Sequence, residues 1–556
     1  MSSYRLPFFR LNFSNIKLSI CLISNVILIM SLYYNLSSLI FPLSLTLSIL
    51  FGVMFIFNKD KIKPVEIFMI FLPLAVTRYI FTIRFGLPSG YDDIHAHIIW
   101  TENAIINGNI NFAYLAQSSD NFVGLYVYYN IVKLFTNIDI PYLAIYLQPI
   151  VDIASFIVFY KFVRLFSREK IALIALVLFG WEPVIFDFGE YRTQSFCLIF
   201  LLTFLYFIVK NKNNYNKSEI ILSILLMMDI TITSFVTFFI CYILIFVAIF
   251  TNIFSKIIIK TKEKELFPLN KFHLLTFTIL FIGYISYIGN SINNLLPAII
   301  KEINNTFFFK YSTPNIMSSI FIDYGIGTFY IQWIVKAVIF IFTMVLFLHQ
   351  LYYKKNITLS ILTFTLGFLT LLGLLGSFEL NSNRIYYFFI IFASITMAKG
   401  YEVINNYLSI NYAKFLRVFL FFLILFFAIF SIIRLPNYII GNTYPFRTNS
   451  TIDKLTYYDV TNKDINIGKF LNQYGINKYI YFNTLENIFS YYYPFTRTIP
   501  LYEYNINNFN NSLIIFLHDN YNGNRDYYGR DQFPTVKDLS DLNLVFQNRD
   551  MFLFYK

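Results

Sequence analysis

Long apolar runs separated by short polar gaps fill the first 435 residues of the chain. Many runs reach the roughly 18 to 20 residues that cross a hydrocarbon core, and so they predict helices that span a membrane. We expect a polytopic α-helical membrane protein with about thirteen transmembrane helices. The predicted spans cover residues 17–34, 38–57, 64–83, 141–163, 170–188, 194–209, 219–234, 235–252, 272–290, 328–349, 357–377, 385–399 and 416–434.

The pattern changes at about Pro436, where apolar runs shorten and Asn, Asp and Tyr become frequent. Ile465–Tyr474 is typical of a helix. Alternating apolar residues predict strands at Lys478–Phe482, Ser512–Leu517, Leu542–Phe546 and Met551–Tyr555, the last two forming a closing hairpin. We therefore divide the chain into a transmembrane module, residues 1–435, and a small C-terminal α/β domain, residues 436–556.

Lysine and arginine residues indicate how the spans are oriented, because cytoplasmic loops are enriched in both. They gather at the N-terminus and in every second gap: Arg5, Arg10 and Lys17; Lys59, Lys61 and Lys63; Arg164, Arg168 and Lys170; Lys210, Lys212 and Lys217; Lys256, Lys260, Lys262, Lys264 and Lys271; Lys354 and Lys355; Lys414 and Arg417. We expect a multi-pass protein of the plasma membrane with a cytoplasmic N-terminus. The outer side then holds loops 84–140 and 291–327, two short turns and an extracytoplasmic C-terminal domain.

Composition agrees with a membrane protein. The chain is 57% hydrophobic and only 13% charged, whereas soluble domains average about 25% charged residues. The net charge of +12 comes largely from the gaps between spans, so nucleic-acid binding is the weaker explanation. Cys21, Cys197 and Cys241 all lie in apolar runs, which argues against a disulfide framework or a CxxC metal site.

The most informative segment follows the third predicted span, at the start of the outer loop 84–140. Asp92, Asp93, His95 and His97 fall within six residues of an otherwise apolar chain. Ionisable groups at a membrane boundary are costly to keep there and therefore suggest a functional site.

Apolar residues recur at helical spacing after His97, and Gly108 is typical of a helix stop. The spacing predicts an interfacial helix with Asp93 and His97 on one face. A carboxylate at its N-terminal end is favoured by the helix dipole and stays ionised, as a general base requires. Two plainer interpretations stay open: Asp92 as a helix cap, and His95 as an interfacial residue.

The same cluster suggests a divalent metal. Carboxylate and imidazole ligands from Asp92, Asp93, His97 and also His95 suit Mn²⁺ or Zn²⁺. The carboxylates alone would also suit Mg²⁺, and we expect Mn²⁺ or Mg²⁺ at Asp92, Asp93 and His97. No spaced partner motif such as HExxH accompanies them. Metal binding therefore remains a hypothesis beside metal-free general-base chemistry.

Two further outer turns carry charge. Glu190 and Arg192 lie between two short spans, and Arg384 begins a late apolar run. A guanidinium fork suits a phosphate group. The alternatives are that Glu190 pairs with Arg192, and that Arg384 extends its side chain to the membrane surface. Asp229 is either a boundary residue or a buried polar contact.

With these features the chain resembles the GT-C class of integral-membrane glycosyltransferases, which use polyprenyl-phosphate-linked sugars on the outer face. Enzymes of the mannosyl- and aminoarabinosyl-transferase branch carry Asp-Glu, then a helix, then Gly about fifteen positions after the Asp. Asp93 and Gly108 have this spacing, although Ile94 replaces the second acidic residue. The turn Glu190–Gln194 and Arg384 also resemble family features.

The resemblance implies transfer of a sugar from a polyprenyl-phosphate donor to a lipid, glycan or protein acceptor, with inversion at the sugar carbon. Asp93 would act as the base or orient the acceptor, with Asp92 as the alternative. His97, Glu190, Arg192, Arg384 and Arg84 would bind substrate. The WWD-type signature of oligosaccharyltransferases is missing from the sequence, which argues against transfer of whole glycans to Asn. The competing hypothesis is a transporter or flippase of lipid-linked oligosaccharides.

Overall fold

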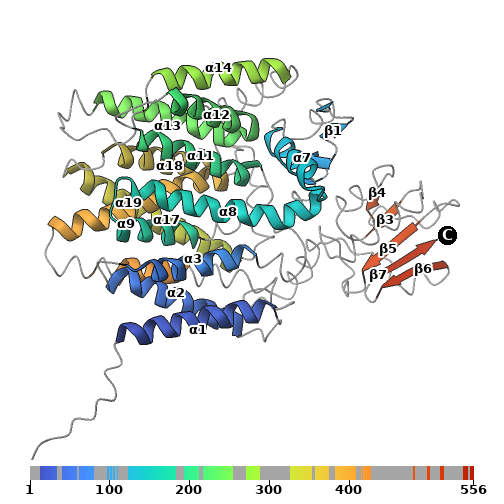
Figure 1. The fold of residues 1–556 in the computed structure, drawn as a ribbon, viewed down its shortest axis with the longest axis horizontal. Helices are drawn as coiled ribbons and strands as arrows, with labels where there is room; N and C mark the ends of the chain where they lie inside the picture. The colour runs from blue at the N-terminus through green and yellow to red at the C-terminus, as the bar shows by residue number, and fades with distance from the viewer. Residues whose placement is uncertain are drawn as a thin grey trace, which may run out of the picture.

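The computed structural model spans the chain, and the part of it that the structure describes consists of residues 13–33, 40–58, 62–79, 97–98, 100–102, 104–106, 109–110, 123–182, 193–211, 217–254, 269, 271–288, 326–352, 357–374, 382–407, 415, 418–427, 480–482, 498–500, 514–518, 543–548 and 551–555. Within these ranges, helices form one bundle and strands form two small sheets (Figure 1).

The helices are α1 (Phe13–Tyr33), α2 (Ile40–Asn58), α3 (Pro64–Arg78), α7 (Gly124–Thr136), α8 (Ile140–Arg164), α9 (Glu169–Gly180), α11 (Thr193–Lys210), α12 (Lys217–Thr233), α13 (Phe235–Phe254), α14 (Lys271–Ile288), α17 (Ile326–Tyr352), α18 (Ile357–Leu374) and α19 (Ser382–Tyr407). A further apolar helix covers Val418–Phe427.

Every predicted span overlaps a helix, because an apolar run satisfies its backbone hydrogen bonds within itself when it is helical. Three described helices are long and apolar enough to cross a membrane: Tyr142–Arg164, Thr193–Lys210 and Val236–Ile253. The helical character of the runs is thus confirmed. The total of thirteen crossings stays a prediction.

The predicted span 170–188 corresponds to a shorter helix. Helix α9 ends at Gly180, and Trp181 and Glu182 leave the helical path. Every residue from Ile171 to Gly180 is buried. Helix α9 therefore runs through the middle of the bundle, and its 12 residues measure only about 18 Å, short of the roughly 30 Å of a hydrocarbon core.

The start of α9, the end of α2 and the C-terminal part of α19 meet at one end of the bundle. Lys170 Nζ donates to the carbonyl oxygen of Phe57 at 3.4 Å. This bond joins the start of α9 to the end of α2. Arg168 Nε lies 3.8 Å from a carboxylate oxygen of Glu402 near the end of α19. The alternation of basic gaps predicts that these helix ends lie on the cytoplasmic side, and that orientation stays a prediction. We call this end of the bundle the basic end.

Polar side chains inside the bundle bond to one another, while many apolar side chains face outward. Gln350 of α17 accepts from Ser360 of α18 at 2.7 Å and donates to the carbonyl of Thr396 of α19 at 3.1 Å. The hydroxyls of Thr363 and Thr396 lie 2.7 Å apart. Such interhelical bonds stabilise helices that pack in lipid, where burial of apolar surface supplies no net attraction.

The C-terminal strands are β3 (Ile480–Phe482), β4 (Thr498–Pro500), β5 (Ile514–His518), β6 (Asn543–Asn548) and β7 (Met551–Tyr555), in the sheet order β4-β3-β5-β7-β6. Strands β4 and β5 run parallel to β3, and β7 pairs antiparallel with β5 and β6. The four predicted strands and the closing hairpin are confirmed, and β4 is an addition. The predicted helix 465–474 lies outside the described residues.

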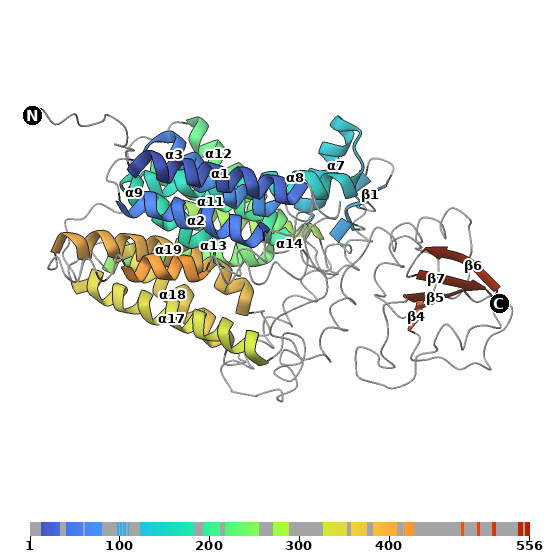
Figure 2. The same cartoon turned by 90° about the horizontal axis from the view of Figure 1, so that it is seen from below.

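Helix α7, the small sheet and the five-stranded sheet all lie at the end of the bundle opposite the basic end (Figures 1 and 2). The first residues of α8 point to this same end. The described part of segment 84–140 and the C-terminal strands therefore lie at the same end of the bundle. Which side of a membrane this end faces stays a prediction.

Candidate functional site

The structure describes only part of the predicted site. The side chain of His97 is described, and so is the backbone of Arg384 within α19. Arg84, Asp92, Asp93, His95, Glu190 and Arg192 lie outside the described residues. Their proposed roles therefore remain predictions.

The helix predicted to run from His97 to Gly108 is shorter than expected. Helical residues occur at 97–98 and 100–102, and then Ile105–Ile106 (β1) pairs antiparallel with Asn109–Ile110 (β2). Ile106 faces Asn109 across the hairpin, so the residues between the strands are Asn107 and Gly108. Asn-Gly strongly favours a two-residue hairpin. The prediction that Gly108 ends a helix is wrong.

His97 is buried against α7. Its Nδ1 lies 3.0 Å from the hydroxyl oxygen of Tyr126. Its ring meets that of Trp100 edge-on, with 5.0 Å between centroids. The Thr101 hydroxyl donates to the carbonyl oxygen of His97 at 2.6 Å. These contacts hold the segment that directly follows the acidic cluster.

Asn130 of α7 completes this attachment. Its Nδ2 donates to the carbonyl oxygen of Thr101 at 2.7 Å and to that of Tyr126 at 2.9 Å. Tyr126, Tyr129 and Asn130 have the spacing i, i+3 and i+4, so they share one face of α7. That face bears segment 97–102.

Other α7 residues fasten the helix to the bundle. The Tyr128 hydroxyl donates to Asp229 of α12. Burial, and next the neighbouring Asp229 carboxylate, raise the pKa of Tyr128, so the hydroxyl keeps the proton that it donates. Asp229, which the sequence left undecided, is thus a half-buried polar contact.

Gly124 and Val123 position the start of α7. A Cβ on Gly124 would lie 2.2 Å from Thr233 Oγ1 and 2.8 Å from Thr233 Cα, so only glycine allows this approach to the end of α12. The backbone N–H of Val123 donates to the hydroxyl of Tyr284 of α14 at 3.3 Å.

A buried chain of polar groups leads from α7 into the membrane helices. The Tyr129 hydroxyl donates to Gln148 Oε1 at 3.1 Å, and Gln148 Nε2 donates to Asp152 Oδ1 at 3.0 Å. The Asp152 carboxylate also lies within electrostatic range of the Arg78 guanidinium and of Tyr387. Arg78, the last residue of α3, faces the ring of Phe156 at 5.1 Å.

A second charged group flanks the start of α19. Lys336 Nζ of α17 lies 5.0 Å from the ring centroid of Tyr386. Tyr386 also interacts electrostatically with Glu182, which follows α9. Lys336 and Glu182 are both buried. Tyr386 thus faces Glu182 and Lys336, whereas the adjacent Tyr387 faces Asp152 and Arg78. Arg384 lies two residues before Tyr386 in α19.

Arg78, Asp152, Glu182 and Lys336 were not among the predicted site residues. Each is an ionisable residue inside or at the end of an apolar run, and in a membrane protein that is itself an indication of function. The sequence could have singled them out by this criterion. It could not have shown that α3, α8, α9 and α17 bring them beside Tyr386 and Tyr387 of α19.

A metal site is not visible in the described part of the chain. Among these residues no three His, Cys, Asp or Glu side chains gather closely enough to hold an ion. Asp92 and Asp93 belong to the proposed ligand set and are not described, so the structure does not test the metal hypothesis.

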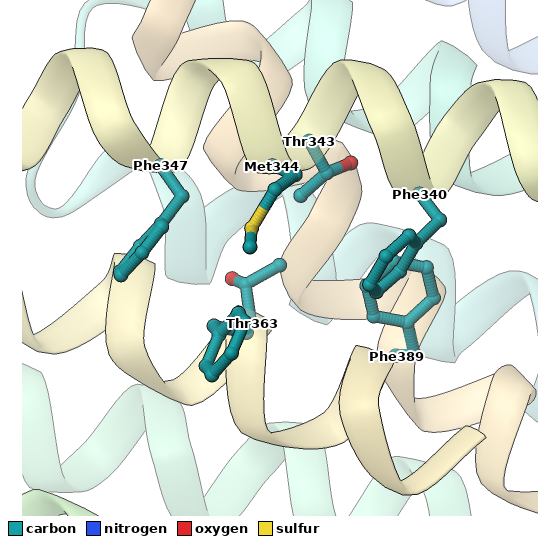
Figure 3. A pocket seen from close by; sticks show the side chains of 7 residues that line it. Phe340, Thr343, Met344, Phe347, Thr363 and Phe389 are labelled. Atoms are coloured by element: carbon teal, nitrogen blue, oxygen red, sulfur yellow. The ribbon is translucent and has the colours of Figure 1, made fainter. Parts of the chain in front are cut away.

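An apolar pocket lies elsewhere in the bundle (Figure 3). The cavity has a volume of only about 10 Å³ and is lined by Phe340, Thr343, Met344, Phe347, Thr363, Phe364 and Phe389. These side chains come from α17, α18 and α19 and include no ionisable group. The pocket therefore offers no acid, base or phosphate ligand, and the charged assembly is the better candidate site.

No protein-family model matches the chain, and no curated protein matches it in sequence. Solved structures with partial similarity include the oligosaccharyltransferase of Archaeoglobus fulgidus without ligand, at 11% identity and a TM-score of 0.41, covering 77% of this chain and 64% of that one. The archaeal oligosaccharyltransferase AglB from Archaeoglobus fulgidus, in complex with an inhibitory peptide and a dolichol-phosphate, gives 12% identity and a TM-score of 0.38, covering 72% of this chain and 58% of that one.

A third match is the Archaeoglobus fulgidus enzyme in complex with Zn and sulfate, at 11% identity and a TM-score of 0.40, covering 77% of this chain and 62% of that one. This chain thus spans less than two thirds of the length of each of these structures. With TM-scores below 0.5, the matches establish neither a fold family nor an activity for this chain.

Proposed function

We propose that the chain is a membrane glycosyltransferase that moves a sugar from a polyprenyl-phosphate-linked donor to a lipid, glycan or protein acceptor on the extracytoplasmic face. The observation that supports this most is the set of buried charged residues Arg78, Asp152, Glu182 and Lys336 around Tyr386 and Tyr387. Asp152 is joined through Gln148 and Tyr129 to α7, the helix that contacts His97. Cationic and carboxylate groups together suit a phosphorylated donor and a hydroxyl acceptor.

In this proposal Asp93 takes the proton of the acceptor hydroxyl, and Asp92 is the alternative base. Arg192, Arg384 and, less centrally, Arg84 hold the donor phosphate, and Glu190 contributes to the same outer surface. The Nδ1 atom of His97 lies 3.0 Å from the Tyr126 hydroxyl. We therefore propose that His97 contributes to substrate binding indirectly, by holding the chain next to Asp92 and Asp93 in position. A divalent metal, Mn²⁺ or Mg²⁺, is also part of the proposal, and only the ligand types of Asp92, Asp93 and His97 support it.

The domain division belongs to the proposal as well. The transmembrane module, residues 1–435, would carry the chemistry, and residues 436–556 would form an extracytoplasmic domain beside it. The protein would sit in the plasma membrane with its N-terminus in the cytoplasm, as the basic gaps indicate.

A transfer assay tests the proposal. Purified protein in lipid is supplied with radiolabelled polyprenyl-phosphate sugars and a membrane or cell-wall extract as acceptor. We expect label to reach an acceptor with the native chain and to fall at least about a hundredfold with Asp93→Asn, since general acid–base groups contribute about 10²–10⁴. Undiminished transfer by a correctly inserted Asp93→Asn protein would refute the assigned base.

A parallel sample with EDTA tests the metal. Loss of transfer that returns on addition of Mn²⁺ or Mg²⁺ would support a metal requirement. Full activity in EDTA would remove the metal from the proposal and leave the general base unaffected.

One observation favours the transporter hypothesis. Transporters place ionisable residues inside their spans, and Asp152 lies in the middle of α8, which covers Ile140–Arg164. Lipid vesicles that hold the protein and a labelled lipid-linked oligosaccharide separate the two functions. Movement of the lipid between leaflets without any glycosylated product would favour the transporter.

A further inference from the structure

Helix α7 exposes an apolar face that no described element covers. Ile131, Leu134 and Phe135 have the spacing i, i+3 and i+4, and they share one side of the helix. Leu134 is 80% exposed and Phe135 is 87% exposed. Ile138, also exposed, follows directly after Asn137, whose φ of 54° ends the helix with a left-handed turn. We call these four side chains the α7 apolar patch.

The other parts of α7 are engaged with protein. Gly124, Leu125, Tyr126, Tyr129 and Asn130 are buried, and they attach the first two turns to segment 97–102 and to the bundle. The patch therefore lies on the free C-terminal half of a firmly held helix. With 13 residues, α7 is about 20 Å long and too short to span a bilayer.

The patch continues into a surface that faces lipid. Helix α8 contains a candidate membrane span, Tyr142–Arg164. Its exposed residues Tyr142, Tyr146 and Ile150 recur every fourth position along one face, and Ile138 of the patch is separated from the start of α8 only by its N-cap residue Asp139. Tyrosines at the start of a span are typical of the membrane–water interface, which places the end of α7 at that level.

The charges around the patch fit the same location. Lys133 is the one charged residue of α7, and its Nζ lies 3.9 Å from a carboxylate oxygen of Asp139 beyond the helix. A lysine beside an apolar face extends its ammonium toward the headgroups while its methylene chain stays in apolar surroundings.

We propose that the α7 apolar patch inserts into the outer leaflet of the membrane, so that α7 is a lipid-bound interfacial helix. Its partner is the headgroup and upper acyl region of the bilayer. Because α7 also holds His97, the patch sets the height of segment 97–102 at the bilayer surface. The insertion itself does not depend on the proposed transferase activity.

Spin labels at single cysteines test the proposal in the full chain in lipid nanodiscs. The native Cys21, Cys197 and Cys241 are fully buried, so label goes to an introduced cysteine. The test positions are Leu134→Cys and Phe135→Cys. Ile150→Cys on α8 serves as the lipid-facing control, and Thr136→Cys, exposed beside the patch, as the aqueous control. Collisions with oxygen report lipid, and collisions with a water-soluble nickel chelate report water.

We expect positions 134 and 135 to resemble position 150, with an oxygen-to-nickel collision ratio several-fold above that of position 136. Ratios equal to that of position 136 would overturn the proposal, because the patch would then face water. Protection from both reagents would also overturn it, since another protein segment would be covering the patch. No outcome of this experiment depends on sugar transfer, so the proposal and the proposed function fail separately.

Discussion

Nδ1 of His97 lies 3.0 Å from the hydroxyl oxygen of Tyr126, although 29 residues separate them in the chain. This contact joins the segment next to the acidic cluster to a helix that is itself fastened to α8, α11, α12 and α14. The predicted base, Asp93, lies only four residues before His97 in the chain. It therefore lies close in sequence to a residue that is firmly held.

Loss of the Tyr126 hydroxyl tests that anchor. Tyr126→Phe keeps the ring beside His97 and Trp100 but removes the hydrogen bond, and we expect the free energy of unfolding to fall by about 1 kcal/mol. Unfolding by SDS in mixed micelles measures the change. Tyr146→Phe, at an exposed tyrosine of α8, is the control and should be neutral. Equal losses in both variants would contradict a specific role for the contact.

Gly124→Ala should displace α7. The added methyl would lie 2.8 Å from Thr233 Cα, which is backbone and cannot rotate away, so we expect a loss of about 1–3 kcal/mol. Gly283→Ala in α14 is the matched control, because a Cβ there meets nothing within 4 Å. That change should be neutral or stabilise by up to about 1 kcal/mol, since alanine favours helices. Unfolding by SDS in mixed micelles measures the stability of both variants. A loss of the same size in both would contradict a specific role for Gly124.

Asp152→Leu should leave the buried Arg78 guanidinium without its carboxylate neighbour. Removal of one member of a buried charge pair costs about 3–5 kcal/mol, whereas replacement of both by apolar residues is often neutral. We therefore expect Arg78→Met combined with Asp152→Leu to recover most of the stability lost in the single variant. Additive losses in the double variant would show that the two charges do not act as a pair.

Tyr128→Phe should loosen the contact between α7 and α12. Asp229 is only half buried, so water replaces part of the lost hydrogen bond, and we expect a loss of about 1.5 kcal/mol. Asp229→Asn keeps an acceptor oxygen for Tyr128 and should cost less. A larger loss for Asp229→Asn than for Tyr128→Phe would mean that Asp229 serves another partner.

The helices were predictable because the rule that governs them is local. Apolar runs such as Val236–Ile253 must be helical wherever they lie in lipid, whatever their neighbours are. The strands Ile514–His518 and Met551–Tyr555 were predictable from alternation and from the turn between the last two strands. By contrast, the strands Ile105–Ile106 and Asn109–Ile110 were not predicted, because their isoleucines also fit helical spacing.

The site was only partly predictable for a different reason. The sequence by itself determined that this is a membrane protein with apolar helices, basic residues in every second gap and charged residues at apolar boundaries, since composition and order along the chain decide these features. Only the tertiary structure decided that Tyr126 meets His97, that Gln148 joins Tyr129 to Asp152, and that Glu182 and Lys336 flank Tyr386. These partners lie far apart in sequence, and which of them meet depends on how the helices pack, because a buried polar group takes whatever partner the packing brings within reach.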